Sequence, residues 1–252
     1  MILIADGGST KCDWAVVDCS AGTILHRFQS EGLNPYARTE EDILSTLTVV
    51  VAPQVDSYDL SAVHFYGAGV TPEKSSLLCT LIGKVISAET ITAQSDMECA
   101  ARALVGNGEG IVAILGTGSN SAYYRGGERV CGVAALGYIL GDEGSGAVIG
   151  RTLLGDIFKG VAPKHIVEQF NEQYGINQAE VLQRVYRTEQ ANRYLASFTK
   201  FLSARLDDMY VYSLVEQCFE SFVRRNLRQY PHRDLYAVGS IAYHFEAVLR
   251  RV

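Results

Sequence analysis

The chain has 252 residues, of which 48% are hydrophobic and 20% charged, a composition typical of globular proteins. The net charge of −6 and the lack of any Lys/Arg block argue against a nucleic-acid partner. The longest apolar stretches, such as residues 47–53, are far shorter than the ~20 residues that a membrane helix needs, so we expect no membrane partner.

The first 105 residues predict three consecutive strands and then alternating helices and strands. The strands are expected at residues 2–5, 13–18, 23–28, 62–66 and 89–93. The helices are expected at residues 40–51, ended by Pro53, at 71–86, with Pro72 at its first position, and at 96–104. This order of elements indicates a mixed sheet in an α/β domain.

The second part of the chain repeats this plan. An apolar strand at 110–115 runs into a Gly-Thr-Gly-Ser-Asn loop at 116–120, and strands follow at 121–125 and 129–133. From residue 144 the chain reads as mostly helical up to a last strand at 235–238, which leads through Gly-Ser-Ile-Ala into a helix. We therefore predict two α/β domains, residues 1–105 and 106–252, and expect that the second is truncated at its C-terminus.

The loop after the first strand reads Asp-Gly-Gly-Ser-Thr-Lys at residues 6–11. It differs from a Walker A loop, because a strand and not a helix follows it. Glycines let backbone N–H groups face an anion, and Lys11 adds a charge for a phosphate. Asp6 would repel phosphate but suits Mg²⁺. A plain hairpin turn would explain this loop alone, or the loop at 116–120 alone. Because the two loops stand at matching positions in the two halves of the chain, phosphate binding is the favoured interpretation.

Four motifs, at residues 6–11, 116–120, 141–145 and 239–242, together resemble the N-acetylglucosamine kinase family. This family belongs to the actin/hexokinase/Hsp70 ATPase superfamily and is related to the ATP-driven activators of benzoyl-CoA reductase and 2-hydroxyacyl-CoA dehydratase. The resemblance implies two ribonuclease H-like domains, each with a five-stranded mixed sheet, and an interdomain cleft for ATP and substrate. It also implies ATP-dependent phosphorylation of an amino sugar, with N-acetylglucosamine converted to its 6-phosphate.

The resemblance also implies which residues contact each ligand. For ATP and its phosphates they are Gly7, Gly8, Ser9, Thr10, Lys11, Gly116, Thr117, Gly118, Gly239 and Ser240, with Mg²⁺ at Asp6. For the sugar they are Asn34, Asp96, Ser119, Asn120, Gly137, Asp142 and Gly146. Residues 134–138 depart from the pattern, because they lack the Gly-Trp pair that some relatives carry there.

Asp96 is the predicted catalytic base. Sugar phosphorylation needs a carboxylate that accepts the hydroxyl proton, and Asp96 follows a strand at the start of a short Ala-containing helix, as the base does in the family. A helix N-terminus favours the ionised form that a base requires. The simpler alternative is that Asp96 only caps the helix at 97–104.

Two predicted sugar contacts also have simpler alternatives. Asp142 and Glu143 stand between glycines, where a ligand can approach closely, but either acid could instead cap the helix at 147–158. Asn34 offers an amide that both donates and accepts hydrogen bonds, but Asn-Pro is also a common turn.

Three further expectations concern the state of the protein. Six scattered cysteines without CxxC spacing indicate buried reduced thiols, which fits a cytoplasmic location, and a strand directly after Met1 indicates no signal peptide. Abundant aromatics at residues 181–228 suggest a homodimer, although a core role explains them nearly as well.

Two functions compete with the kinase: an activator ATPase that shares an iron–sulfur cluster between subunits, and a non-catalytic sugar or nucleotide sensor.

Overall fold

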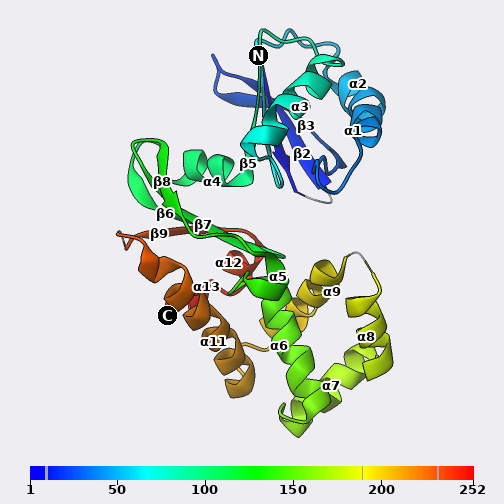
Figure 1. Ribbon diagram of the computed structural model, residues 1–252, viewed down its shortest axis with the longest axis vertical. Coiled ribbons are helices and arrows are strands. Elements are labelled where there is room, and N and C mark those ends of the chain that lie inside the picture. Colours follow the sequence, from blue (N-terminus) through cyan, green and yellow to red (C-terminus); the bar gives the residue numbers. More distant parts are fainter. Residues whose placement is uncertain (9–10, 189, 232) are drawn as a thin grey trace. The chain divides into compact units, whose positions relative to one another are not determined.

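The computed structural model describes residues 1–8, 11–188, 190–231 and 233–252, shown as a ribbon in Figure 1. The chain divides into two compact units, unit 1 at residues 1–99 and unit 2 at residues 100–252. The division falls inside helix α4 (Asp96–Leu104), six residues before the boundary expected from the sequence. None of the described helices combines the length and apolar character that crossing a bilayer requires.

Unit 1 is built on a five-stranded mixed sheet in the order β3-β2-β1-β4-β5, which confirms the prediction. Strand β1 pairs antiparallel with β2 and parallel with β4, and β4 pairs parallel with β5. The strands are β1 (Ile2–Gly7), β2 (Lys11–Asp18), β3 (Thr23–Glu31), β4 (Ala62–Gly67) and β5 (Thr90–Ser95).

One face of this sheet carries the core of unit 1. Alternate residues such as Leu3, Trp14 and Phe65 are buried against helices α1 (Glu40–Thr46) and α3 (Pro72–Gly83). Apolar side chains at every second position place this whole set on one face, because successive strand residues point to opposite sides. Figure 1 shows these helices beside the sheet.

The prediction that Pro53 ends the first helix is wrong. Helix α1 continues through a π-helical turn, η1 (Leu47–Val51), into a further helical turn, α2 (Ala52–Val55), which contains Pro53. In the π-turn the N–H of Ala52 bonds to the carbonyl of Leu47, five residues back. Pro53 lies at the start of the next turn, where its missing N–H is not needed, so the chain stays helical.

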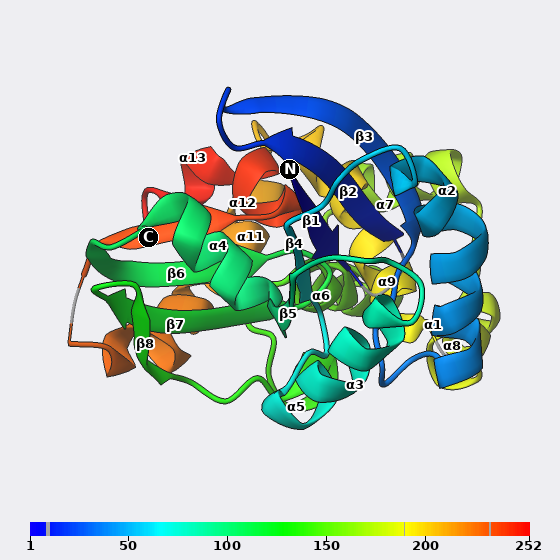
Figure 2. The ribbon, with the colours of Figure 1, turned by 90° about the horizontal axis from the view of Figure 1, so that it is seen from above.

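Unit 2 contains a four-stranded sheet in the order β8-β7-β6-β9. The strands are β6 (Glu109–Leu115), β7 (Ser119–Arg125), β8 (Glu128–Gly132) and β9 (Leu235–Val238). Figure 2 shows the green β6–β7–β8 meander with β9 beside β6. The predicted fifth strand is not found among the described residues of this unit, and β9 forms the edge of the sheet.

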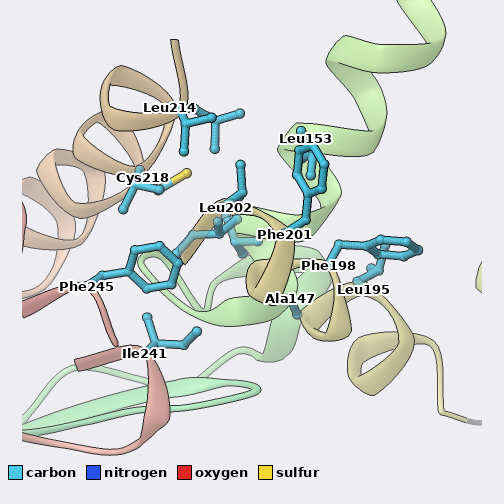
Figure 3. Close-up of a cluster of buried hydrophobic side chains, with 14 of the residues drawn as sticks. Ala147, Leu153, Leu195, Phe198, Phe201, Leu202, Leu214, Cys218, Ile241 and Phe245 are labelled. Carbon is cyan, nitrogen blue, oxygen red and sulfur yellow. The ribbon is translucent and has the colours of Figure 1, made fainter. Parts of the chain in front are cut away.

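Helices make up most of the rest of unit 2. They are α5 (Gly137–Leu140), α6 (Gly146–Lys159), α7 (Lys164–Tyr174), α8 (Gln178–Tyr186), α9 (Ala191–Ser197), α10 (Thr199–Ser203), α11 (Met209–Arg225), η2 (Leu227–Gln229), α12 (Ser240–His244) and α13 (Glu246–Leu249). Figure 3 shows their buried side chains meeting in one cluster, to which α6, α10, α11 and α12 all contribute.

The aromatic residues that suggested a homodimer mostly belong to this core. Phe198 and Phe201 are buried, and Tyr194, Tyr210 and Tyr212 pack partly buried against the same cluster. Tyr186, from the same stretch, is instead largely exposed. Homodimer formation therefore stays a prediction, without the support of these side chains.

The six cysteines are all free thiols, but the expectation that they are buried holds for two of them. Cys12 and Cys218 are buried, and burial raises the pKa of both thiols, that of Cys218 to about 11. Cys79 and Cys99 are half-buried. Cys19, in the turn after β2, and Cys131, in the edge strand β8, are exposed.

Candidate functional site

The candidate residues of unit 1 lie along one edge of its sheet. Strands β1, β4 and β5 run parallel, and Gly7, Gly67 and Ser95 stand side by side at their carboxyl ends. Lys11 and Glu31, paired between β2 and β3, bring the loop after β3 to the same edge. The pairing therefore gathers the first loop, the Asn34 loop and Asp96 at one end of the sheet.

The first loop brings charged groups of both signs together. Lys11 Nζ lies 2.8 Å from Asp13 Oδ2, a partner that the sequence interpretation did not consider, and Gln29 also donates to Asp13. Loss of hydration and the nearby Asp13 charge raise the pKa of Asp6, while Lys11 opposes this rise. A cation beside Asp6 would relieve both effects. Two predicted phosphate contacts of this loop, Ser9 and Thr10, lie outside the described residues.

Asp96 directly follows β5 and is the first residue of α4. Its Oδ1 accepts a hydrogen bond of 2.9 Å from the N–H of Met97, so the carboxylate does serve the helix start. Burial is the main cause that raises the pKa of Asp96, and the Asp6 charge adds to it, whereas the Met97 N–H lowers it. The pKa of Asp96 is therefore set mainly by burial and not by the helix N-terminus, contrary to the sequence-based expectation.

Gln94, two residues before Asp96 in the chain, adds an unexpected polar group. Its Oε1 is buried and has no hydrogen-bond partner in the described part of the chain. Strand pairing places Gln94, Tyr66 and Asp6 in one cross-strand row. Because buried polar atoms are nearly always paired in native proteins, this oxygen marks a place for a donor from water or a ligand.

Asn34 is held in a turn, as the simpler alternative proposed, but its side chain is also tightly placed. Its Oδ1 accepts from the N–H of Tyr36 at 2.9 Å, and its carbonyl accepts from Ala37 and Arg38. A Cβ on Gly69, which has φ of +77°, would collide with the Asn34 carboxamide. The loop after β4 thus depends on glycine for two reasons, backbone conformation and the space that Asn34 occupies.

The candidate residues of unit 2 also meet at the carboxyl ends of parallel strands, here β6 and β9. The β6–β7 loop is closed by a hydrogen bond of 2.9 Å from Gly116 N to Gly118 O, and Thr117 at its tip is exposed. Gly239 has φ of +105°, and a Cβ there would collide with the carbonyl of Leu115. Glycine at 239 therefore lets β9 turn into α12 directly against the end of β6, with Ser240 exposed.

Asp142 and Glu143 do not cap the following helix. The N-cap of α6 is Ser145, whose Oγ accepts from Val148 N. Asp142 has φ of 52°, the left-handed region, and is the one non-glycine residue of the described chain found there. Its carboxylate accepts a hydrogen bond from the Ser119 N–H, and loss of hydration raises its pKa. An acid held in a strained backbone beside the β6–β7 loop is typical of a functional position.

Three predicted sugar contacts have evident structural roles. Ser119 Oγ donates to Glu143 O at 2.8 Å, and Asn120 Oδ1 accepts from Ser121 N at 2.8 Å. Gly146 is buried, its N–H bonds to Gly116 O, and a Cβ would lie 3.1 Å from Ala196 Cβ. This packing accounts for glycine at 146 without a ligand. Gly137 has φ of +71° and open space around its Cα.

The sequence interpretation missed Gly69 and the role of Asp13. A glycine three residues after the strand expected at 62–66 was the available signal for Gly69, but its meaning depends on contact with Asn34, 35 positions away in the chain. Asp13 was read as part of a strand, although its spacing from Lys11 places both side chains on one face.

Similar proteins identify the fold and the family. A candidate N-acetylglucosamine kinase from Porphyromonas gingivalis is 42% identical, with a TM-score of 0.91 over 100% of this chain and 90% of its own. A candidate N-acetylglucosamine kinase from Chromobacterium violaceum is 19% identical, with a TM-score of 0.75 over 98% of this chain and 90% of its own. A ROK family glucokinase from Streptomyces griseus, solved with glucose and AMPPNP, is 16% identical, with a TM-score of 0.62 over 99% and 87%.

The two more distant structures show the fold, in which each unit of the chain is built on a mixed sheet with loops at the strand ends. The identity to the Porphyromonas protein over the whole chain goes further: the chain belongs to the N-acetylglucosamine kinase family. No protein-family profile and no curated protein matches the sequence.

Proposed function

We propose that this protein is a kinase that transfers the γ-phosphoryl group of ATP to an amino sugar, N-acetylglucosamine, and forms its 6-phosphate. The observation that carries the proposal is 42% identity, over the entire chain, to a protein named as a candidate N-acetylglucosamine kinase. The placement of phosphate-type loops and carboxylates at the edges of both sheets supports it.

The two glycine loops are the proposed phosphate contacts. In unit 1, the backbone at Gly7 and Gly8 and the charge of Lys11 bind phosphate oxygens. Lys11 is exposed and pairs with Asp13, so its flexible side chain can exchange this surface ion pair for a phosphate at little cost. In unit 2, Gly116, Thr117 and Gly118 bind phosphate, and the turn at Gly239 and Ser240 meets the adenosine.

Asp6 fits the magnesium ion that ATP carries. Its carboxylate stands at the strand end with a raised pKa, caused by loss of hydration and by the Asp13 charge, and a divalent cation would favour its ionised form. Magnesium in such sites uses one or two carboxylates together with substrate phosphates and water. When bound, the ion neutralises charge that builds up on the phosphates during transfer.

Asp96 is the proposed base. The Met97 N–H bond to Oδ1 orients the carboxylate, which accepts the proton of the sugar C6 hydroxyl. A pKa raised by burial makes the carboxylate a better proton acceptor. A role as base and a contact with the helix N-terminus are therefore compatible in one side chain.

Asn34 and Asp142 are the proposed sugar contacts with the most defined geometry. Tyr36 N–H fixes the carboxamide of Asn34, and Ser119 N–H fixes the carboxylate of Asp142. Side chains held in this way bind hydroxyl groups with a smaller loss of conformational entropy. Ser119 and Asn120 contribute through the loop that they stabilise, and Gly137 and Gly146 provide backbone close to the sugar.

A coupled assay for ADP release tests the function. Purified protein is given ATP and magnesium with N-acetylglucosamine, N-acetylmannosamine, N-acetylmuramic acid or glucosamine in separate reactions. We expect the highest kcat/KM for N-acetylglucosamine, with product phosphorylated at C6. Turnover restricted to another of these sugars would correct the substrate, and the absence of sugar-dependent turnover with all four would refute the kinase proposal.

The two competing functions have less support. The relative that is 42% identical bears a kinase name, which favours the kinase over an activator ATPase. Retention of both Asp6 and Asp96 at the sheet edge favours an enzyme over a sensor, which needs no base. A cytoplasmic location and a homodimer remain parts of the proposal that rest on the sequence.

A further inference from the structure

Asp142 and Gly118 are close neighbours in unit 2, although 24 residues separate them. The carboxylate of Asp142 is half-buried beside the β6–β7 loop and accepts the N–H of Ser119. A Cβ added to Gly118 would lie 2.9 Å from Asp142 Oδ2 and 3.4 Å from its Cγ. Heavy atoms do not approach a real Cβ this closely, so any side chain at 118 would displace the carboxylate.

The surroundings leave the Asp142 side chain as the part that would move. Backbone hydrogen bonds join the two loops, from Gly146 N to Gly116 O at 2.8 Å and from Ala147 N to Thr117 O at 3.0 Å. Ser119 Oγ adds a bond to Glu143 O at 2.8 Å. Asp142 also lies in the left-handed region, a conformation that persists only where the surrounding structure imposes it.

We propose that Gly118 is a positioning residue for sugar recognition: it leaves empty the space that the Asp142 carboxylate needs in order to face the sugar. This inference rests on the proposed function, in which Asp142 contacts the sugar. It is separate from the phosphate contact proposed above for Gly118, which is made by the backbone and which an alanine would keep. The two roles predict changes in the Michaelis constants of different substrates.

Gly118→Ala separates these roles. Gly118 does not have a positive φ, so alanine adopts its backbone conformation without strain. We expect the KM for N-acetylglucosamine to rise about tenfold, as when a substrate hydrogen bond is lost, while the KM for ATP changes by less than about twofold. The matched control is Gly155→Ala in α6, where the added methyl group would meet nothing within 4 Å and kinetics should not change.

A double variant shows whether Gly118 acts through Asp142. Asp142→Ala alone should also raise the sugar KM, and adding Gly118→Ala to it should raise the sugar KM no further, because the displaced group is already absent. If Gly118→Ala folds poorly in a thermal melt, Asp142→Glu fills the same space from the other side and should raise the sugar KM similarly.

The outcomes distinguish this inference from the proposed function. Loss of ATP affinity in Gly118→Ala with an unchanged sugar KM, or additive effects in the double variant, would overturn the inference while wild-type turnover keeps the kinase. A wild-type protein that phosphorylates none of the amino sugars would refute the kinase, and the sugar role of Asp142 with it.

Discussion

Both units place a polar side chain of the candidate site against a glycine, but they differ in which of the two residues has the left-handed backbone. Each presents one polar side chain against a glycine, Asn34 against Gly69 in unit 1 and Asp142 against Gly118 in unit 2. In unit 1 the glycine has the left-handed backbone, and the polar residue sits in an ordinary turn. In unit 2 the polar residue itself has the left-handed backbone, and its glycine does not.

This difference shows which substitutions affect folding and which affect binding alone. Replacing Gly69 introduces both backbone strain and a collision with Asn34, whereas replacing Gly118 introduces the collision alone. The units also differ in their acids, because Asp96 of unit 1 is a candidate for proton transfer and Asp142 of unit 2 is a candidate for binding. Four predictions test this comparison.

The largest effect is expected from exchanging the two acids for amides. Asp96→Asn should lower kcat by about 10²–10⁴, because the amide cannot accept the proton, with little change in ATP binding. Asp142→Asn should keep its fold, since Asn tolerates the left-handed backbone. It should mainly raise the sugar KM, by about tenfold. Steady-state kinetics with both substrates measure the contrast. If folded Asp96→Asn keeps more than about a tenth of wild-type turnover, Asp96 is not the base.

Stability separates two glycines that both have positive φ. In Gly239→Ala the new methyl group collides with the backbone carbonyl of Leu115, so we expect a loss of about 3–4 kcal/mol in the free energy of unfolding. In Gly69→Ala it collides with a side chain, that of Asn34, and not with the backbone, so the loss should be smaller, about 1–2 kcal/mol. Urea unfolding compares them, and an equal loss would contradict the distinction.

Lys11→Met should raise the KM for ATP about tenfold or more through loss of a charge-assisted phosphate contact. Its ion pair with Asp13 is exposed, so stability should change by no more than ~1 kcal/mol. Lys164→Met is the matched control, because Lys164 is an exposed lysine in a weak ion pair with Glu168, in α7. An unchanged ATP KM in Lys11→Met would remove Lys11 from the phosphate site.

The smallest effect concerns the dependence of stability on pH. The folded pKa of Asp96 lies above its unfolded value, so the folded state binds more protons between the two values and stability falls as pH rises through that window. Asp96→Asn removes the buried charge and should melt above wild type at pH 7. The advantage should shrink as the pH falls below about 4, because the wild-type carboxyl then becomes protonated in the unfolded state as well. A constant difference at all pH values would contradict this account.

Much of the fold could be predicted because it depends on local pattern. Strand β9 and helix α4 have the predicted bounds, since period-two apolar runs and a helix start after a strand are read directly from neighbouring residues. Pro53 misled the prediction, because the π-turn that accommodates it depends on packing and not on the local sequence. The aromatics of the helical part could not be assigned from composition, since a buried core and a dimer interface are both rich in aromatic residues.

The loops of the candidate site could be predicted from the sequence, but the contacts between its residues could not. Glycine, serine and acidic residues after apolar strands indicate the loops at residues 6–11 and 116–120. The left-handed backbone of Asp142 and its approach to Gly118 arise where separate segments meet, and no local pattern encodes them. The same holds for Asn34 and Gly69.

The positions of the exposed thiols allow each unit to be labelled with a fluorescent dye. Cys19 and Cys131 are exposed, one in each unit, while Cys12 and Cys218 are buried with raised pKa values and should react slowly with maleimides. Replacing the half-buried Cys79 and Cys99 by serine would leave two natural attachment points for a donor and an acceptor dye. Energy transfer between the dyes would then follow the separation of the two units as nucleotide and sugar are added.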